Sequence, residues 1–448
     1  MFLRSLNFRQ LVTTAVIGLS LITYIFFCYC TKRHEHISIS LCFLGLFTFY
    51  ILLLKLDLST GLMVKIGLVF RLIILISAPN LSQDFYRFFW DGQLILNGFN
   101  PYLNTPNEII ISKLISFPKM NEIYELMSSL SQNNYSNYPP IHQIITFITL
   151  LITDKSIIAS IVSLRLILIL FDLGILFYGI KILKILKKPK NIIFIYFLNP
   201  LVILELIGNL HLEGVMVFFM VLSFYHLYKK SEIYSGIFLG LSILTKLIPL
   251  IILPVFLFRL GLKKSIRFIV TIIAVISIGF APFINFKSLI NYSESINLWF
   301  SNFEFNASIY YALKEIFKGF NIRLIDYMAY IIPISIFIVL TYLISTKKNR
   351  TQDILTQSLI VLTTYLFIST TIHPWYIIPL IFLSCFTNYR YPIFWSFTIF
   401  LSYFSYYEIQ VNENQFLIAI EYGLVIGILF YEIYFKKLNH HKLTDFNF

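Results

Sequence analysis

Apolar runs close to the length of a bilayer crossing recur along almost the whole chain. In lipid, every backbone polar group must find a hydrogen-bond partner within the protein, so such runs fold as helices. Hydrophobic residues make up 58% of the 448 residues, charged residues only 13%, and the mean hydropathy is +0.79. The sequence predicts an all-α fold, a polytopic transmembrane helical bundle of about 12 to 14 membrane segments, some short or re-entrant. It leaves no room for a separate soluble domain, so we expect a single membrane domain over residues 1–448.

The first apolar run, Leu11 to Cys30, is longer than a signal-peptide core and lacks a small-residue cleavage site, so we expect a retained helix. The four cysteines lie in apolar segments without paired spacing, which supports neither a disulfide framework nor a thiolate metal site. The expected crossings lie near 11–30, 38–55, 61–78, 157–180, 192–208, 214–228, 267–283, 324–345, 354–372, 376–387, 392–407 and 415–434.

The formal net charge of +13 reports topology rather than nucleic-acid binding, because the basic residues cluster in short connections between apolar runs. These clusters mark the cytoplasmic side, which places both termini in the cytoplasm. The longer connections 79–140, 284–323 and 408–414 then face the opposite side. The clusters are Lys181 to Lys190, Lys229 with Lys230, Arg259 to Arg267, Lys347 to Arg350, and Lys436 with Lys437.

The most informative polar stretch is SQDFYRFFWDGQLILNGFNPY, residues 82–102, at the start of the largest outer connection. On a helix, Asp84 and Asp91 share one face with Arg87 beside them, while Phe85, Tyr86 and Phe89 face the other way. One interpretation is a reactive polar face on a helix lying along the membrane. The other is an aromatic belt with solvated charges, since Trp and Tyr gather at membrane interfaces.

Two apolar segments do not fit simple crossings. Residues 141–152 are too short, and residues 236–258 have basic residues at both ends and are split by Lys246 and Pro249. We interpret the second as two short helices that form a hairpin with Lys246, in LTKLIP, at its tip. Broken helices are tolerated in membranes where they line a cavity. The alternative is one ordinary crossing that breaks the charge rule.

Ionisable residues within apolar segments are costly and therefore indicate function or pairing. Arg165 and Asp172 share a helix face but lie about 10 Å apart along the axis, so each needs another partner. Structural pairing is the simpler interpretation for these two. The full set is Lys65, Arg71, Arg165, Asp172, Glu205 and Lys246.

Three further polar motifs lie at expected outer ends of helices. His211 and Glu213, in GNLHLEG, occupy a short connection and are candidates for a site wall. His373 begins the sequence HPWY, which also fits a simple interfacial anchor. Tyr138, in YPP, ends the large connection and enters the next segment in an extended conformation.

The order of these motifs, DFYRFFWDG with GFNPY, then YPP, NP with GNLHLEG, LTKLIP and HPWY, resembles the bacterial mannosyltransferase-like branch of the GT-C superfamily of membrane glycosyltransferases. The resemblance covers roughly residues 60–380. It implies a polyprenyl-phosphate sugar donor, with mannose as the sugar, a multi-pass protein of the bacterial inner (plasma) membrane, and Asp84 as catalytic acid residue. The chain departs from the pattern at Gln93, a position that is often basic. The loop has no Asp-x-Asp pair, so no cofactor is expected and a divalent metal is not supported.

Transfer from a polyprenyl phosphate needs a base for the acceptor hydroxyl and cations for the departing phosphate. We therefore expect Asp84 to act as general base in an inverting reaction, with Lys246 and Arg87 on the phosphate. Sugar hydroxyls would be bound by Asp91, His211 and Glu213, with Tyr138 and His373 in the site wall. The acceptor would be a glycan, lipid or protein at the extracytoplasmic side.

Two other functions fit parts of the pattern. A transporter or flippase of lipid-linked sugars would also contain buried charges and broken helices, but transporters usually show paired repeats, which this sequence lacks. A polysaccharide polymerase or ligase would use a lipid-linked oligosaccharide in place of a monosaccharide.

Overall fold

The computed structural model describes residues 8–153, 156–301, 303–345, 353–407 and 411–438. These residues form helices and the connections between them. They also contain two isolated β-bridges, Phe305–Thr371 and Tyr406–Val411. The predicted all-α fold is thereby confirmed. The expected basic group Lys347 to Arg350, residues 408–410 of the last outer connection and the chain termini (1–7 and 439–448) lie outside the described residues.

Among the described residues, five helices are long and apolar enough to cross a membrane, as expected for a multi-pass integral membrane protein. A sixth crossing is formed if two helical pieces that meet at a bend of 54°, Lys190–Phe197 and Pro200–Gly208, count as one span. The bend falls at Pro200, which lacks an N–H, while Asn199 caps the new helix through its side chain to Leu201 N (2.9 Å). The five long helices are α1 (Phe8–Cys30), α2 (His36–Lys55), α9 (Ile157–Ile185), the segment Leu324–Leu343 in η4 (Leu324–Tyr327) and α18 (Met328–Ser345), and α23 (Gln415–Leu438).

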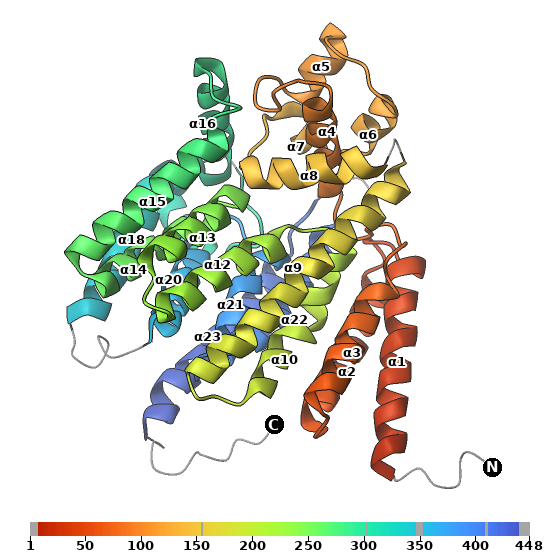
Figure 1. Ribbon diagram of the computed structural model, residues 1–448, viewed down its shortest axis with the longest axis vertical. Helices are drawn as coiled ribbons and strands as arrows, with labels where there is room; N and C mark the ends of the chain where they lie inside the picture. Colours follow the sequence, from red (N-terminus) through yellow and green to blue (C-terminus); the bar gives the residue numbers. More distant parts are fainter. Residues whose placement is uncertain (1–7, 154–155, 302, 346–352, 408–410, 439–448) are drawn as a thin grey trace.

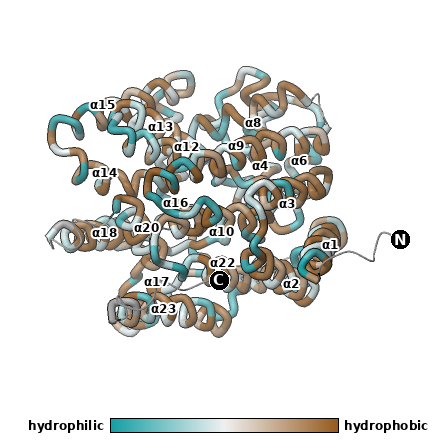
Figure 2. The backbone as a smooth tube through the Cα atoms, turned by 60° about the horizontal axis from the view of Figure 1, so that its bottom comes forward, coloured by the Kyte–Doolittle hydropathy of each residue, from teal (hydrophilic) through white to brown (hydrophobic). Residues whose placement is uncertain are grey.

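The other expected crossings are shorter or broken helices. Figure 2 shows that apolar residues dominate along the helices, whereas hydrophilic residues gather at helix ends and connections. These helices are α3 (Thr60–Leu72), η1 (Lys190–Ile193), α10 (Phe194–Phe197), α11 (Pro200–Val202), η2 (Ile203–Gly208), α12 (Glu213–Tyr228), α13 (Glu232–Thr245), η3 (Ile248–Ile252), α14 (Leu253–Leu260), α15 (Leu262–Phe280), α20 (Ile354–Ile368), η5 (Pro374–Ile377), α21 (Ile378–Ser384), α22 (Tyr391–Thr398) and η6 (Ile399–Ser405).

A layer of short helices lies across one end of the bundle, opposite the start of α1 and the end of α23 (Figure 1). Residues 79–140 supply most of it, as the sequence predicts for an outer connection that carries amphipathic helices. Trp90 packs edge-on against Phe117 and belongs with Met120 and Ile123 to a small separate hydrophobic core, which explains how this connection folds. The layer comprises α4 (Asp84–Leu96), α5 (Pro106–Ser112), α6 (Met120–Leu126), α7 (Ser129–Asn133) and α8 (Pro140–Thr153), joined by α16 (Phe286–Ser301) and α17 (Ile309–Lys318).

The buried charges of α9 pair with different partners, as their axial spacing predicts. Asp172 forms a fully buried ion pair with Arg71 of α3, with 2.7 Å between Nε and Oδ2, and also accepts from Tyr196 OH (3.0 Å). Arg165 donates to the carbonyls of residues 74, 75, 77, 207 and 208. Those carbonyls lie where α3 and η2 end and lack helical partners. Lys65, which we expected to be buried, is exposed.

Residues 232–260 form a hairpin. Contacts of Gly236 with Phe268 and of Gly279 with Leu244 show that α13 and α15 run parallel, so residues 246–260 must return along the bundle between them. An ion pair of 2.9 Å between Arg267 and Glu232 fixes the basic end of the hairpin. The alternative of one ordinary crossing is therefore wrong, and Lys246, in extended conformation directly after α13, forms the tip.

Candidate active site

Asp84 begins α4 at the inner surface of the outer layer. The segment before it is held in place by Leu81 N, which donates to Asn209 Oδ1 (3.1 Å), and by Asn80, whose amide donates to Phe27 O (2.8 Å). The backbone N–H of Asp84 itself donates to Ser82 Oγ (3.3 Å). A carboxylate in the first turn of a helix is favoured by the helix dipole. Asp84 is half-buried as a residue, and burial of its carboxyl group is the main cause of its raised pKa.

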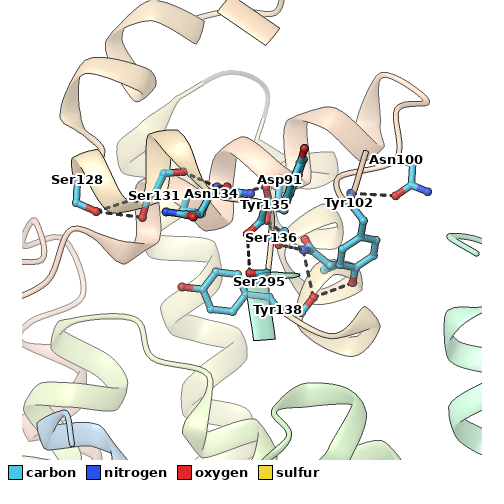
Figure 3. A network of polar contacts seen from close by, with 12 residues as sticks. Asp91, Asn100, Tyr102, Ser128, Ser131, Asn134, Tyr135, Ser136, Tyr138 and Ser295 are labelled. Atoms are coloured by element: carbon cyan, nitrogen blue, oxygen red, sulfur yellow. Dashed lines mark hydrogen bonds and ion pairs between the residues drawn. The ribbon is translucent and has the colours of Figure 1, made fainter. Parts of the chain in front are cut away.

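Farther along α4, Arg87 and Asp91 form a buried ion pair with 2.8 Å between Nε and Oδ1. Asp91 Oδ2 also accepts from Ser136 Oγ (2.5 Å) and Gln143 Nε2 (3.0 Å), and Arg87 donates to the carbonyls of Ser131 and Asn134. Figure 3 shows this network between α4 and the segment that leads into α8. The structure thus places Arg87 and Asp91 in a cluster that anchors α4.

Lys246 and Glu213 meet at the tip of the hairpin. The ammonium of Lys246 forms an ion pair with the carboxylate of Glu213, the first residue of α12, and lies 5.2 Å from the centre of the Tyr376 ring. The Lys246 side chain is 18% exposed and that of Glu213 is 1% exposed. This exposure leaves the ammonium, with its three donors, accessible to a second anion.

Three predicted histidine and tyrosine positions line the same region. His211 and His373 both stack on Trp375, with 3.7 Å and 4.6 Å between ring centres. Tyr138 stacks on His142 at 4.2 Å. The structure therefore brings together motifs that are more than 200 residues apart in the sequence.

Electrostatic interactions show that these groups surround one centre. Burial raises the pKa of Asp84 to about 6, with Lys246 and Arg33 opposing the rise and Glu213 adding to it. Burial, together with the neighbouring positive charge of Lys246, lowers the pKa of His373 to about 3. His373 is therefore neutral at physiological pH, whereas Asp84 is mostly ionised and sits close to a cation.

Buried polar atoms without a hydrogen-bond partner among the described residues include His142 Nδ1 and Glu213 Oε2 at this centre. A buried polar atom without a partner is costly, so such atoms indicate a ligand or water site. Neutral imidazole and carboxylate together suit sugar hydroxyls, which both donate and accept. Within the described ranges, no group of three His, Cys, Asp or Glu side chains is arranged to hold a metal ion.

Sequence reasoning missed His142 and Arg33. His142 follows Tyr138 by one helical turn, so the YPPIH spacing carried a usable signal. Arg33 precedes Asp84 by about fifty residues in a connection without any recognisable motif, and only the fold brings the two together.

The fold is that of a multi-pass membrane protein, and its polar motifs gather around Asp84 and the ion pair of Lys246 with Glu213. A family model described as alpha-(1→6)-mannopyranosyltransferase, N-terminal domain, matches residues 12–261, more than half of the chain. The chain belongs to this family, whose members are GT-C membrane glycosyltransferases that use polyprenyl-phosphate mannose. No curated protein and no solved structure matches the chain.

The family confirms the predicted enzyme class and favours it over the transporter alternative. A mannosyltransferase requires a sugar donor and an acceptor, and the centre around Asp84 is where the matched region brings its polar motifs together.

Proposed function

We propose that this protein transfers mannose from a polyprenyl-phosphate donor to a hydroxyl of a glycan, lipid or protein acceptor, with Asp84 as general base. The observation that carries the proposal is the convergence of Asp84 and Lys246, a half-buried carboxylate and an accessible ammonium whose charge acts on it. Family membership supports the donor class and an α-(1→6) linkage.

In this reaction the carboxylate of Asp84 takes the proton of the acceptor hydroxyl as the oxygen attacks the anomeric carbon of mannose. The bond between that carbon and the phosphate oxygen breaks, and the electron pair leaves with the polyprenyl phosphate. Lys246 stabilises the charge that develops on this phosphate. A single direct displacement inverts the anomeric centre.

The remaining predicted residues take supporting roles. Glu213, His211, His373 and Tyr138 bind sugar hydroxyls, which fits the buried unpaired oxygen of Glu213 and the aromatic stacking around both histidines. Arg87 and Asp91 act as positioning residues, since they pair with each other and with the segment before α8. One donor of Arg87, Nη2, is buried without a hydrogen-bond partner among the described residues.

We also propose that the site faces the outside of a bacterial plasma membrane, with both termini and residues 181–191 in the cytoplasm. The distribution of basic residues supports this orientation, because the clusters within the described residues lie at the end of the bundle opposite α4–α8. Residues 79–140 and 284–323 then belong to one membrane domain as its outer connections.

The test is an assay of the purified full-length protein in lipid nanodiscs with radiolabelled polyprenyl-phosphate mannose and an α-mannoside acceptor. The wild type should form labelled product, and Asp84→Asn should form none above background. Asp326→Asn is the matched control, because the Asp326 side chain is 52% exposed and forms an ion pair with Arg323, which is also exposed. Full turnover by Asp84→Asn would reject the base assignment.

A further inference from the structure

The connection between α1 and α2 carries basic residues at the outer end of the bundle, next to α4. The positive-inside rule does not predict basic residues there. Its sequence, TKRHEH over residues 31–36, places Lys32, Arg33 and His34 beside the segment that leads into α4. The basic clusters that mark the cytoplasm lie at the opposite end. These cations therefore need another explanation.

Two adjoining cavities open beside this connection. One, of about 240 Å³, is lined by Arg33, His34, residues 79–83 and Tyr86. The other, of about 350 Å³, is lined by Lys32, Arg33 and residues 76–80. They share Arg33, Pro79 and Asn80, and each approaches the lower end of the usual range for small-molecule sites, about 300 Å³.

Arg33 is held as a rigid element of both cavity walls. Its guanidinium lies 4.1 Å from the centre of the Tyr406 ring, and Nη1 makes one long hydrogen bond of 3.4 Å to Leu81 O. A guanidinium has five donors in a fork that matches phosphate or carboxylate geometry. The side-chain amide of Asn80 and the hydroxyl of Ser82 add polar groups to the same walls.

The cavities are next to the proposed base but do not include the proposed phosphate site. Ser82, Gln83 and Phe85, the chain neighbours of Asp84, line the smaller cavity, whereas Asp84 itself lines neither cavity. The charge of Arg33 acts on Asp84, whereas Lys246 and Glu213 come from the hairpin and line neither cavity. Asp84 is therefore approached by two separate cationic groups.

We infer that the cavities walled by Arg33 form the acceptor side of the active site and bind a phosphate or phosphodiester group carried by the acceptor. The inference rests on the proposed function, in which a base must touch the acceptor while the donor phosphate is held elsewhere, at Lys246. The cationic site at Arg33 lies beside the base and is separate from the donor phosphate site, so its ligand is the acceptor. Phosphate fits better than a neutral sugar alone, because the charges of Arg33 and Lys32 in the cavity walls match an anion and are not needed for hydroxyls.

The test compares three acceptors with the same α-mannoside: one on a phosphodiester lipid, one on a neutral diacylglycerol, and one on soluble glycerophosphate. Arg33→Gln should raise KM about tenfold for phosphate-bearing acceptors, the effect of one lost charge-assisted hydrogen bond. It should leave KM for the neutral acceptor and for the donor unchanged. Arg33→Lys should recover part of the loss, since it keeps the charge without the fork.

The control is Arg323→Gln, which removes an arginine that is 76% exposed and lies outside both cavities. If Arg33→Gln raises KM only for the lipid acceptor, the site binds a lipid headgroup. If it also raises KM for the glycerophosphate acceptor, the site binds phosphate in any setting. Both results support the inference. An equal rise in KM for neutral and phosphate-bearing acceptors overturns the inference.

Equilibrium binding of the labelled glycerophosphate mannoside separates this inference from the proposed function. If the wild type turns over no acceptor but binds this probe in a manner that depends on Arg33, the cavity assignment stands and the proposed reaction falls. If turnover proceeds and neither binding nor KM responds to Arg33→Gln in a correctly folded protein, the cavity assignment falls and the reaction stands.

Discussion

Glu213, the first residue of α12, forms an ion pair with Lys246 at the tip of the α13–α14 hairpin. The pair joins two elements that the sequence separates by about thirty residues, and it holds the ammonium where its charge reaches Asp84. A hairpin tip without a partner would let the lysine side chain extend into solvent. Glu213 thus orients the cation and keeps one oxygen for a ligand.

Lys246→Ala should reduce kcat about 100-fold, because the departing phosphate would develop its charge in a partly desolvated site without a cation. Lys246→Arg should recover part of the activity, as a planar fork replaces a point charge. The measurement is steady-state transfer with saturating donor, and Lys263→Ala, an exposed lysine at the other end of the hairpin, serves as control. Turnover near that of the wild type in Lys246→Ala would remove Lys246 from the mechanism.

The pH profile of kcat/KM should have an acidic limb near pH 6. The pKa of Asp84 is raised from its ordinary value of 3.8 to about 6 by burial, so the base is protonated and inactive below that pH and active above it. Because Arg33 lowers this pKa, Arg33→Gln should move the limb to higher pH. A profile that stays flat down to pH 4.5 would contradict the assignment.

The buried ion pair between Arg71 and Asp172 should matter for stability and not for chemistry. Asp172→Asn leaves the guanidinium of Arg71 without its counter-charge in the core and should lower the free energy of unfolding by about 3 kcal/mol. The matched change Asp57→Asn, at a side chain that is 92% exposed, should cost less than about 0.5 kcal/mol. Thermal unfolding in one detergent would compare the two, and equal melting temperatures would show that the pair contributes nothing.

The sequence was informative wherever the signal was local. The helix from Asp84, the break at Lys246 and the clustering of YPP, GNLHLEG and HPWY at outer helix ends all follow from periodicity, proline positions and charge. Helical spacing also predicted that Arg165 and Asp172 need separate partners. It did not identify those partners, because Arg71 and the carbonyls of η2 come from other helices.

The sequence could not show which residues of other segments contact Arg87 and Asp91. Their spacing predicted that both lie on one face of α4 with Asp84, and they do lie on α4. Which part of that face meets the substrate depends on the residues opposite, and here Ser136 and Gln143 occupy the place in front of Asp91. Packing between distant segments decides between a ligand contact and a structural one.

The proposed orientation is tested by cysteine labelling in a background without the four native cysteines. A cysteine at Asn133, which is exposed in the outer layer, should react with a membrane-impermeant maleimide added to intact cells. A cysteine at Lys184, exposed near the end of α9, should react only after permeabilisation; Lys188 is less suitable because its ammonium donates to Phe386 O. The reverse pattern would place Asp84 in the cytoplasm and contradict a polyprenyl-phosphate donor.

The most direct test of the account is a single-turnover experiment with Asp84→Asn and labelled polyprenyl-phosphate mannose. The variant should bind the donor with a Kd within about threefold of that of the wild type, because Lys246 and Glu213 remain in place. On addition of acceptor it should form product at least about 1,000-fold more slowly, since no carboxylate takes the hydroxyl proton. Wild-type rates of product formation by this variant would contradict the central claim that Asp84 is the general base.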